Sequence, residues 1–142
     1  MTTKRYLQQI RKISFEIRTE QENVERLRNT LISHGVNYSS ERVKTSPRDR
    51  MSATIAEYLD EEKAITEELK QLRKQKDTII RQLKGLDINV HYEVLYARYV
   101  DLKPFKEISK ELHVSEQTVF VYHRKALREF ELKYGEEYSN IQ

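Results

Sequence analysis

Polar and basic side chains gather at helical spacing in the segment 115–128, SEQTVFVYHRKALR. Its cationic members are Arg124, Lys125 and Arg128, and its one acid is Glu116. Cationic side chains neutralise phosphates, and a guanidinium can also donate two parallel hydrogen bonds to guanine. A glutamine such as Gln117 can pair in the same way with adenine. These residue types predict contact with double-stranded DNA.

The longer stretch 105–128 predicts the scaffold that would present these side chains, two short helices joined by a tight turn. Its apolar residues fall where a helix-turn-helix buries its small core, and they are Ile108, Leu112, Val114, Val119 and Tyr122. Ser115 is the predicted N-cap of the second helix, because its hydroxyl can accept a free backbone N–H of the first turn. In such a motif the second helix lies in the major groove, with its first turns facing the base edges.

Burying Val119 and Tyr122 turns one face of the second helix towards the groove. The residues predicted on this face are Glu116, Gln117, Phe120, Val121 and Arg124. Thr118, Lys125 and Arg128 are better placed for phosphates, and Ser115 stands at the helix start. Phe120 and Val121 can meet thymine methyl groups or pack a subunit interface, and Gln117 and Lys125 have an alternative as ordinary solvated surface.

The sequence offers no support for catalysis, a metal or a cofactor. The chain has no Cys, and its four His are scattered without metal-ligand spacing. There is no Gly-rich phosphate loop and no pairing of a nucleophile with a base. We therefore expect a binding protein and not an enzyme.

Composition and charge predict an extended helical protein. Charged residues make up 35% of the 142 residues and hydrophobic ones 37%, with three Gly and two Pro, a mix that suits long helices with much solvated surface. No apolar run approaches a membrane span, so we expect a soluble protein of the cytoplasm, in a bacterial host cell, without membrane contact. The net charge of +3 is modest, and a homodimer would double the number of phosphate contacts.

Two long helices precede this region. The first is predicted from Lys4 to Ser33, and its heptad positions are Ile10, Ile17, Val24 and Leu31. The second begins at a Ser46 cap followed by Pro47 and ends at Gly85, with heptad positions Met51, Tyr58, Ile65, Leu72, Ile79 and Leu86. A sustained seven-residue repeat predicts a left-handed coiled coil.

An antiparallel hairpin is favoured over a parallel pair of these helices. In the predicted register Leu31 meets Met51, Ile17 meets Ile65 and Ile10 meets Leu72. Glu20 then faces Glu62, and Tyr6 meets Lys76. The connector 34–48 is interpreted as solvated loop, with an arm that touches nucleic acid or a partner as the alternative.

The C-terminal part is predicted as three helices over residues 89–100, 104–112 and 116–134, the last closed by Gly135. The expected fold is therefore all-α, a long antiparallel helical hairpin followed by a small helix-turn-helix domain. The predicted domains are residues 1–86 for the coiled-coil hairpin, 87–135 for the helix-turn-helix domain and 136–142 for a flexible tail.

Residues 94–127 resemble region 4 of the sigma-70 family. The likeness is carried by Val94, Leu95, Arg98, Tyr99, Glu107, Ile108, Leu112, Val114, Ser115, Thr118, Val119, Lys125, Ala126 and Leu127. The chain departs from that pattern at His113, where the turn usually has Gly, and at Ser109, where Ala is usual. Its whole layout is similar to small phage-encoded regulators of the ArpU/RinA kind, including a streptococcal phage protein group.

The resemblance implies a phage transcriptional regulator that binds promoter-like DNA and contacts the host RNA polymerase. A small terminase subunit for DNA packaging is an alternative, although such subunits commonly place the DNA-binding domain first. The other alternative is a coiled-coil interaction module that grips RNA polymerase and uses the helix-turn-helix for packing only. The near balance of basic and acidic groups over residues 88–134 favours that option slightly.

Overall fold

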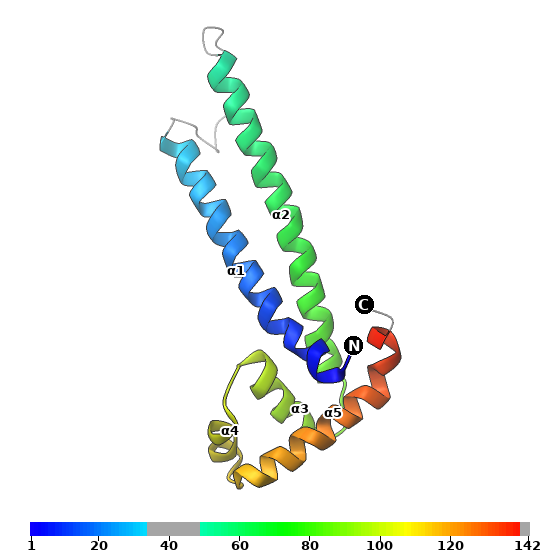
Figure 1. The fold of residues 1–142 in the computed structure, drawn as a ribbon. Helices are drawn as coiled ribbons and strands as arrows, with labels where there is room; N and C mark the ends of the chain where they lie inside the picture. The colour runs from blue at the N-terminus through cyan, green and yellow to red at the C-terminus, as the bar shows by residue number, and fades with distance from the viewer. Residues whose placement is uncertain (34–48, 140–142) are drawn as a thin grey trace. The chain divides into compact units, whose positions relative to one another are not determined.

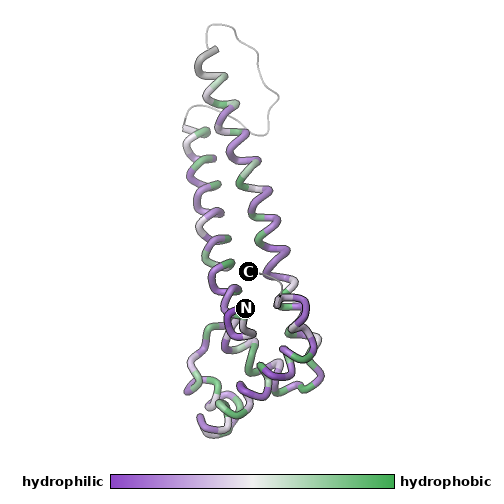
Figure 2. Tube along the Cα trace, turned by 45° about the vertical axis from the view of Figure 1, so that its right-hand side comes forward, coloured by the Kyte–Doolittle hydropathy of each residue, from purple (hydrophilic) through white to green (hydrophobic). Residues whose placement is uncertain are grey.

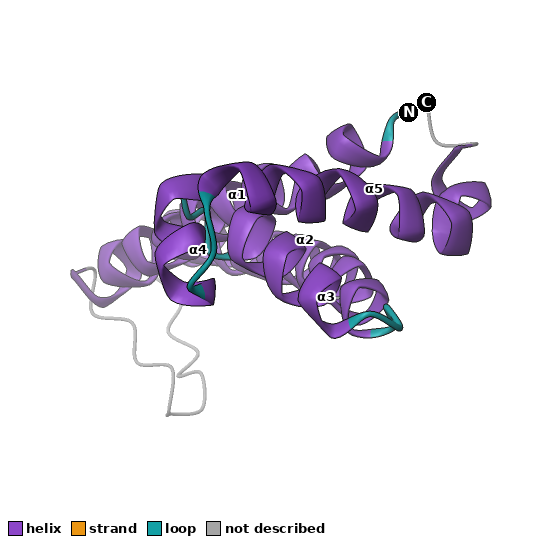
Figure 3. Ribbon diagram, turned by 90° about the horizontal axis from the view of Figure 1, so that it is seen from below, coloured by secondary structure: helices purple, strands orange, loops and turns teal. Residues whose placement is uncertain are grey.

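The computed structural model describes residues 1–33 and 49–139. For residues 49–52 it describes the backbone alone. Every element in this part of the chain is helical, and none is a strand (Figure 3). The all-α prediction is thus confirmed. The connector 34–48, with the predicted Ser46 and Pro47 start signal, lies outside the described residues, as do residues 140–142 of the predicted tail.

Two long helices open the chain, α1 over Thr3–Ser33 and α2 over Asp49–Lys84. The chain divides into two compact units, and both helices pass from one to the other. We call residues 1–15 with 74–142 the terminal unit, and residues 16–73 the middle unit. The domain division predicted at residue 86 stays a prediction.

The terminal unit contains the remaining elements, α3 over Asn89–Leu95, η2 over Tyr96–Val100, α4 over Phe105–Leu112 and α5 over Glu116–Ser139 (Figure 1). The helix predicted over 89–100 is therefore split, because its last turn widens to a π-helix in which the Asp101 N–H bonds to the Tyr96 carbonyl at 3.1 Å. Pro104 is extended, with φ −69° and ψ 154°, and stands just before α4 instead of within it.

A small apolar core joins α3, η2, α4 and α5. Its buried members are Val94, Ala97, Ile108 and Val119, and the partly buried residues packed on them are Val90, Phe105, Leu112, Val114 and Tyr122. All the residues predicted for the core of the α4–α5 segment belong to this cluster. Burying one apolar face of each short helix is what lets helices of 7 and 8 residues persist.

A second, aromatic cluster corrects the predicted end of α5. The helix continues through Gly135 to Ser139, and Tyr138 is only 2% exposed. The Tyr138 ring stacks on Tyr6 at 4.3 Å, and Tyr6 also lies 6.0 Å from Phe130. The prediction of a helix end near Tyr134 and of a tail from residue 136 is thus wrong as far as residue 139. Burial of Tyr138 outweighs the cost of about 1 kcal/mol for a glycine within a helix.

The predicted pairing of α1 with α2 is wrong by about one heptad. In the terminal unit the Tyr6 hydroxyl donates to Gln82 Oε1 at 2.6 Å, and in the middle unit Arg28 Nε donates to Glu62 Oε1 at 2.7 Å. Apolar positions recur along both helices (Figure 2), so a slide of seven residues keeps most, but not all, of the seam positions apolar. The observed register gives Glu62 a guanidinium as its neighbour, whereas the predicted one faced it with the carboxylate of Glu20.

Candidate nucleic-acid interface

The turn between α4 and α5 depends on a left-handed residue. His113 has φ 57° and ψ 41°, in the position where the sequence lacks the usual glycine. Its N–H bonds to the Lys110 carbonyl at 3.3 Å, and the Val114 N–H bonds to the Ser109 carbonyl at 3.1 Å. These are the two hydrogen bonds of a Schellman motif, and they close α4 despite the strain of a non-glycine residue at positive φ.

The first turn of α5 is capped as predicted. The Thr118 N–H donates to Ser115 Oγ at 3.1 Å, and the two hydroxyl oxygens lie 2.9 Å apart. Ser115 is exposed and Thr118 is half-buried. The cap satisfies one of the free N–H groups at the helix start and thereby fixes where α5 begins.

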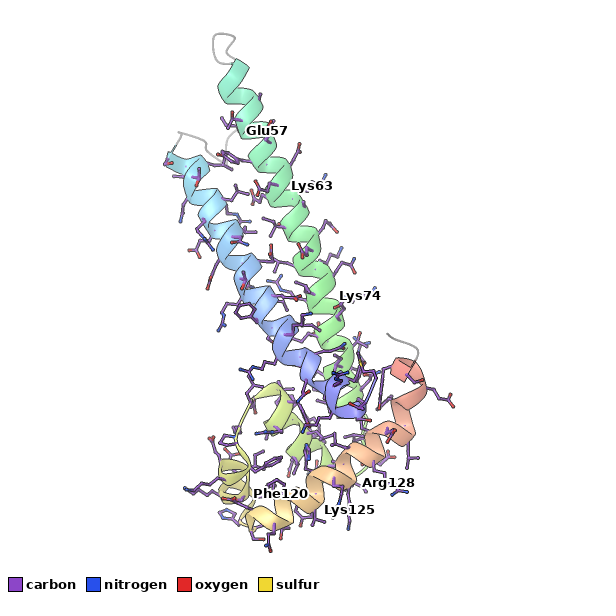
Figure 4. The ribbon with its side chains drawn as sticks, viewed as in Figure 1. Glu57, Lys63, Lys74, Phe120, Lys125 and Arg128 are labelled. Carbon is purple, nitrogen blue, oxygen red and sulfur yellow. The ribbon has the colours of Figure 1, made fainter. Side chains whose placement is uncertain are left out.

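One face of α5 carries exposed polar and cationic side chains. Its members are Gln117, Arg124, Lys125 and Arg128, all of them exposed. Figure 4 shows Lys125 and Arg128 along the outer edge of the helix. Residues seven and eleven positions apart share a helix stripe, so Gln117, Arg124 and Arg128 form one row. Within the described part of the chain, Arg124, Lys125 and Arg128 form no ion pair and no hydrogen bond through their side chains.

The acids of α5 near this row are distributed unequally. Glu129 turns inward, where it lies 2.8 Å from His91 Nδ1 and accepts a hydrogen bond from the Asp87 N–H at 2.8 Å. The exposed acids flanking the row are Glu116 before it and Glu131 after it. Between those two positions the outer face of α5 is cationic.

Phe120 and Val121 stand at the edge of this face. Phe120 is 52% exposed, and its ring lies 4.6 Å from that of Phe105 in α4. The Arg98 guanidinium covers the Phe105 ring at 4.4 Å. Val121 is half-buried. Phe120 thus keeps about half of its surface exposed while it packs on Phe105, and base contact by Phe120 and Val121 stays a prediction. The stack of Arg98 on Phe105 was not predicted.

His123 lies beneath the outer face and is neutral at physiological pH. Its Nε2 lies 2.8 Å from the Tyr99 hydroxyl. Burial, with the nearby charges of Arg98 and Lys4, lowers the pKa of His123 to about 4. Burial also raises the pKa of Tyr99 to about 12, so the phenol keeps its proton and forms a neutral hydrogen bond with the ring nitrogen. His123 is thus a neutral packing residue on the inner side of α5, without positive charge for a phosphate.

No family model matches this chain, and no curated protein or solved structure matches it either. Among residues 1–33 and 49–139, no group of His, Asp and Glu is arranged to hold a metal ion. In the same residues, no helix has both the length and the apolar character needed to cross a bilayer.

Proposed function

We propose that this chain is a sequence-specific DNA-binding protein that reads the major groove with the first turns of α5. One observation carries the proposal. A capped helix follows directly on a tight left-handed turn, and its outer row keeps Gln117, Arg124 and Arg128 exposed and without ionic partners. This arrangement of two helices and a turn supports a helix-turn-helix, a motif whose second helix enters the groove.

Each side chain of the row has a proposed role set by its chemistry. Gln117 and Arg124 read base edges, because an amide suits adenine and a guanidinium suits guanine. Lys125 and Arg128 bind phosphates on the flanks of the groove, with the hydroxyl of Thr118 as a weaker phosphate donor. Ser115 and Glu116 stand at the start of the helix, where Glu116 can accept a hydrogen bond from cytosine.

The regulatory part of the proposal rests on the resemblance of residues 94–127 to region 4 of the sigma-70 family. It implies control of phage promoters in the bacterial cytoplasm and contact with the host RNA polymerase. We further propose a homodimer through the long helices, since Ile32 is 58% exposed and Ile17 and Ile65 are only half-buried in the middle unit. A dimer would present two copies of α5 to two half-sites.

Binding should be measured by gel shift of the full chain against fragments tiling its own genomic neighbourhood, with random DNA as competitor. We expect one fragment to be retained selectively. Arg124→Ala should weaken that complex by about 1–3 kcal/mol and relax its specificity, whereas Lys125→Ala should weaken all complexes alike and reduce the salt slope by about 1. The matched control is Lys63→Ala, which removes an exposed lysine of α2 (Figure 4).

Equal retention of all fragments, or none, would overturn specific recognition. In that event the second candidate is a protein-interaction module, which is favoured by Leu132, 81% exposed on α5. It predicts that Arg124→Ala leaves DNA binding unchanged. The gene beside a retained fragment, and a ring-shaped assembly if one forms, would separate a regulator from a small terminase subunit.

A further inference from the structure

A cleft of about 280 Å³ lies between the α3–η2 segment and α4. Its apolar lining consists of Ala97, Ile108 and Leu112. Tyr92 and Tyr96 also line it, and their rings meet edge to face with centroids 5.7 Å apart. No residue of α5 contributes to this lining. The cleft is therefore separate from the face that we propose for DNA.

The charged groups around the cleft are predominantly acidic. They are Glu93, Asp101, Glu111 and Lys103, so three carboxylates stand against one ammonium. Lys103 Nζ lies 2.8 Å from Glu111 Oε1, and Glu93 accepts a hydrogen bond from Asn89 Nδ2 at 3.0 Å. Within the described residues the exposed carboxylate of Asp101 has neither a hydrogen bond nor an ion pair.

The size and charge of the cleft restrict what it can hold. Small-molecule pockets usually measure about 300–1,000 Å³ and enclose most of the ligand, so this cleft is small for that use. The excess of carboxylates repels phosphate and so disfavours nucleic acid in this cleft. A cation is favoured by the carboxylates, and an aromatic ring such as that of Tyr92 or Tyr96 can add a cation–π contact. Lys103 already shows that an ammonium group fits against Glu111.

We propose that this cleft docks a segment of a partner protein that presents an arginine beside an apolar side chain. The guanidinium lies against Tyr92 or Tyr96 and donates to Asp101, while the apolar neighbour covers Ile108 and Leu112. Arginine suits the site better than lysine because its planar guanidinium stacks on aromatic rings and can bind a carboxylate with two hydrogen bonds. This interaction goes beyond DNA binding and does not depend on it.

The test uses the full chain labelled with ¹³C at its tyrosine rings and two capped peptides, Ac-Leu-Arg-Leu-NH₂ and its neutral citrulline twin. The ring resonances are assigned with Tyr92→Phe and Tyr96→Phe, and the peptides are titrated by NMR. We expect the arginine peptide to shift the signals of both rings in a saturable way. The citrulline peptide should bind about two- to fivefold more weakly, as expected for loss of one exposed charge pair.

Two substitutions on the rim should act in opposite directions. Asp101→Asn removes the proposed partner and should weaken the arginine peptide about two- to fivefold, whereas Lys103→Ala removes the resident cation and should strengthen it by a similar factor. Both variants should leave the citrulline peptide unchanged. Equal binding of the two peptides, no saturable shift, or weakening by both substitutions would overturn the proposal. Helicity of the two variants by circular dichroism shows whether they fold.

Discussion

The terminal unit and the middle unit are stabilised by different kinds of contact. Of the largest fully buried side chains among the described residues, only Leu31 belongs to the middle unit, and the others lie in the terminal unit. The terminal unit also has a buried hydrogen bond between Tyr6 and Gln82. In the middle unit the ion pair of Arg28 with Glu62 is largely solvated on the arginine side, where 54% of the side chain is exposed.

This difference means that the two units should respond differently to substitution and to solvent conditions. Buried apolar contacts lose several kcal/mol when a side chain is truncated, whereas exposed ion pairs contribute 1 kcal/mol at most, as a rough rule. The middle unit has one apolar seam between two helices. A further helix packed on it would bury more apolar surface and so increase its stability. The comparison therefore agrees with the proposed homodimer through the long helices.

Phe130→Ala should have the largest effect on stability. The ring is fully buried among Tyr6, Tyr134 and Tyr138, so its loss should cost about 3–5 kcal/mol. Urea unfolding followed by tyrosine fluorescence measures this cost. The milder Phe130→Leu retains most of the apolar volume, so its free energy of unfolding should lie between those of Phe130→Ala and the natural chain. An unchanged midpoint for Phe130→Ala would contradict an aromatic core in the terminal unit.

Acid should weaken the terminal unit through His123. In the folded protein the pKa of His123 is about 4, below its ordinary value of 6.5. Between these two pH values the unfolded chain therefore binds the proton more readily than the folded protein does. Stability is therefore fully present above pH 6.5 and falls as the pH drops towards 4, by about 1–3 kcal/mol.

The matched variant for this effect is His123→Gln, whose amide retains a hydrogen-bonding group for Tyr99 but does not titrate. Urea unfolding at pH 7, 5.5 and 4 should show a steeper loss for the natural chain than for the variant. Parallel pH profiles for the two proteins would mean that the protonation of His123 is not coupled to folding.

Arg28→Ala should change stability less than either Phe130→Ala or the protonation of His123. We expect a loss of about 0.2–1 kcal/mol, because solvent screens the exposed guanidinium. Thermal unfolding at low salt and in 1 M NaCl measures it, and the difference should shrink in high salt. Arg73→Ala, which removes an exposed arginine of the same unit, is the control. A loss above about 2 kcal/mol would reverse the comparison between the units.

Features decided by neighbouring residues were predictable from the sequence. Ser115 caps α5 because a hydroxyl in that position can reach the N–H of Thr118. His113 takes the left-handed conformation because the turn requires it, although the residue is not glycine. The core residues of the α4–α5 segment followed from the helical spacing of apolar residues.

Features decided by distant contacts were not predictable. The heptad pattern leaves registers one heptad apart nearly equivalent, and single polar pairs such as Tyr6 with Gln82 distinguish them. Gly135 is a local stop signal, but burial of Tyr138 carries α5 past it. Arg98 stacks on Phe105, and Phe105 lies against Phe120. These residues belong to three different segments, and their spacing in the sequence does not predict the contact.

The hydrogen bond between the hydroxyls of Thr3 and Tyr138 has a consequence for synthesis of the chain. The two residues are 135 positions apart, so the first turns of α1 leave the ribosome long before their partner. Synthesis proceeds from the N-terminus at about 5–20 residues per second, and contacts between distant residues form slowly. The contacts of the first turn of α1 with α5 can therefore form only after Tyr138 has been synthesised, and until then Tyr6 lacks the ring that covers it.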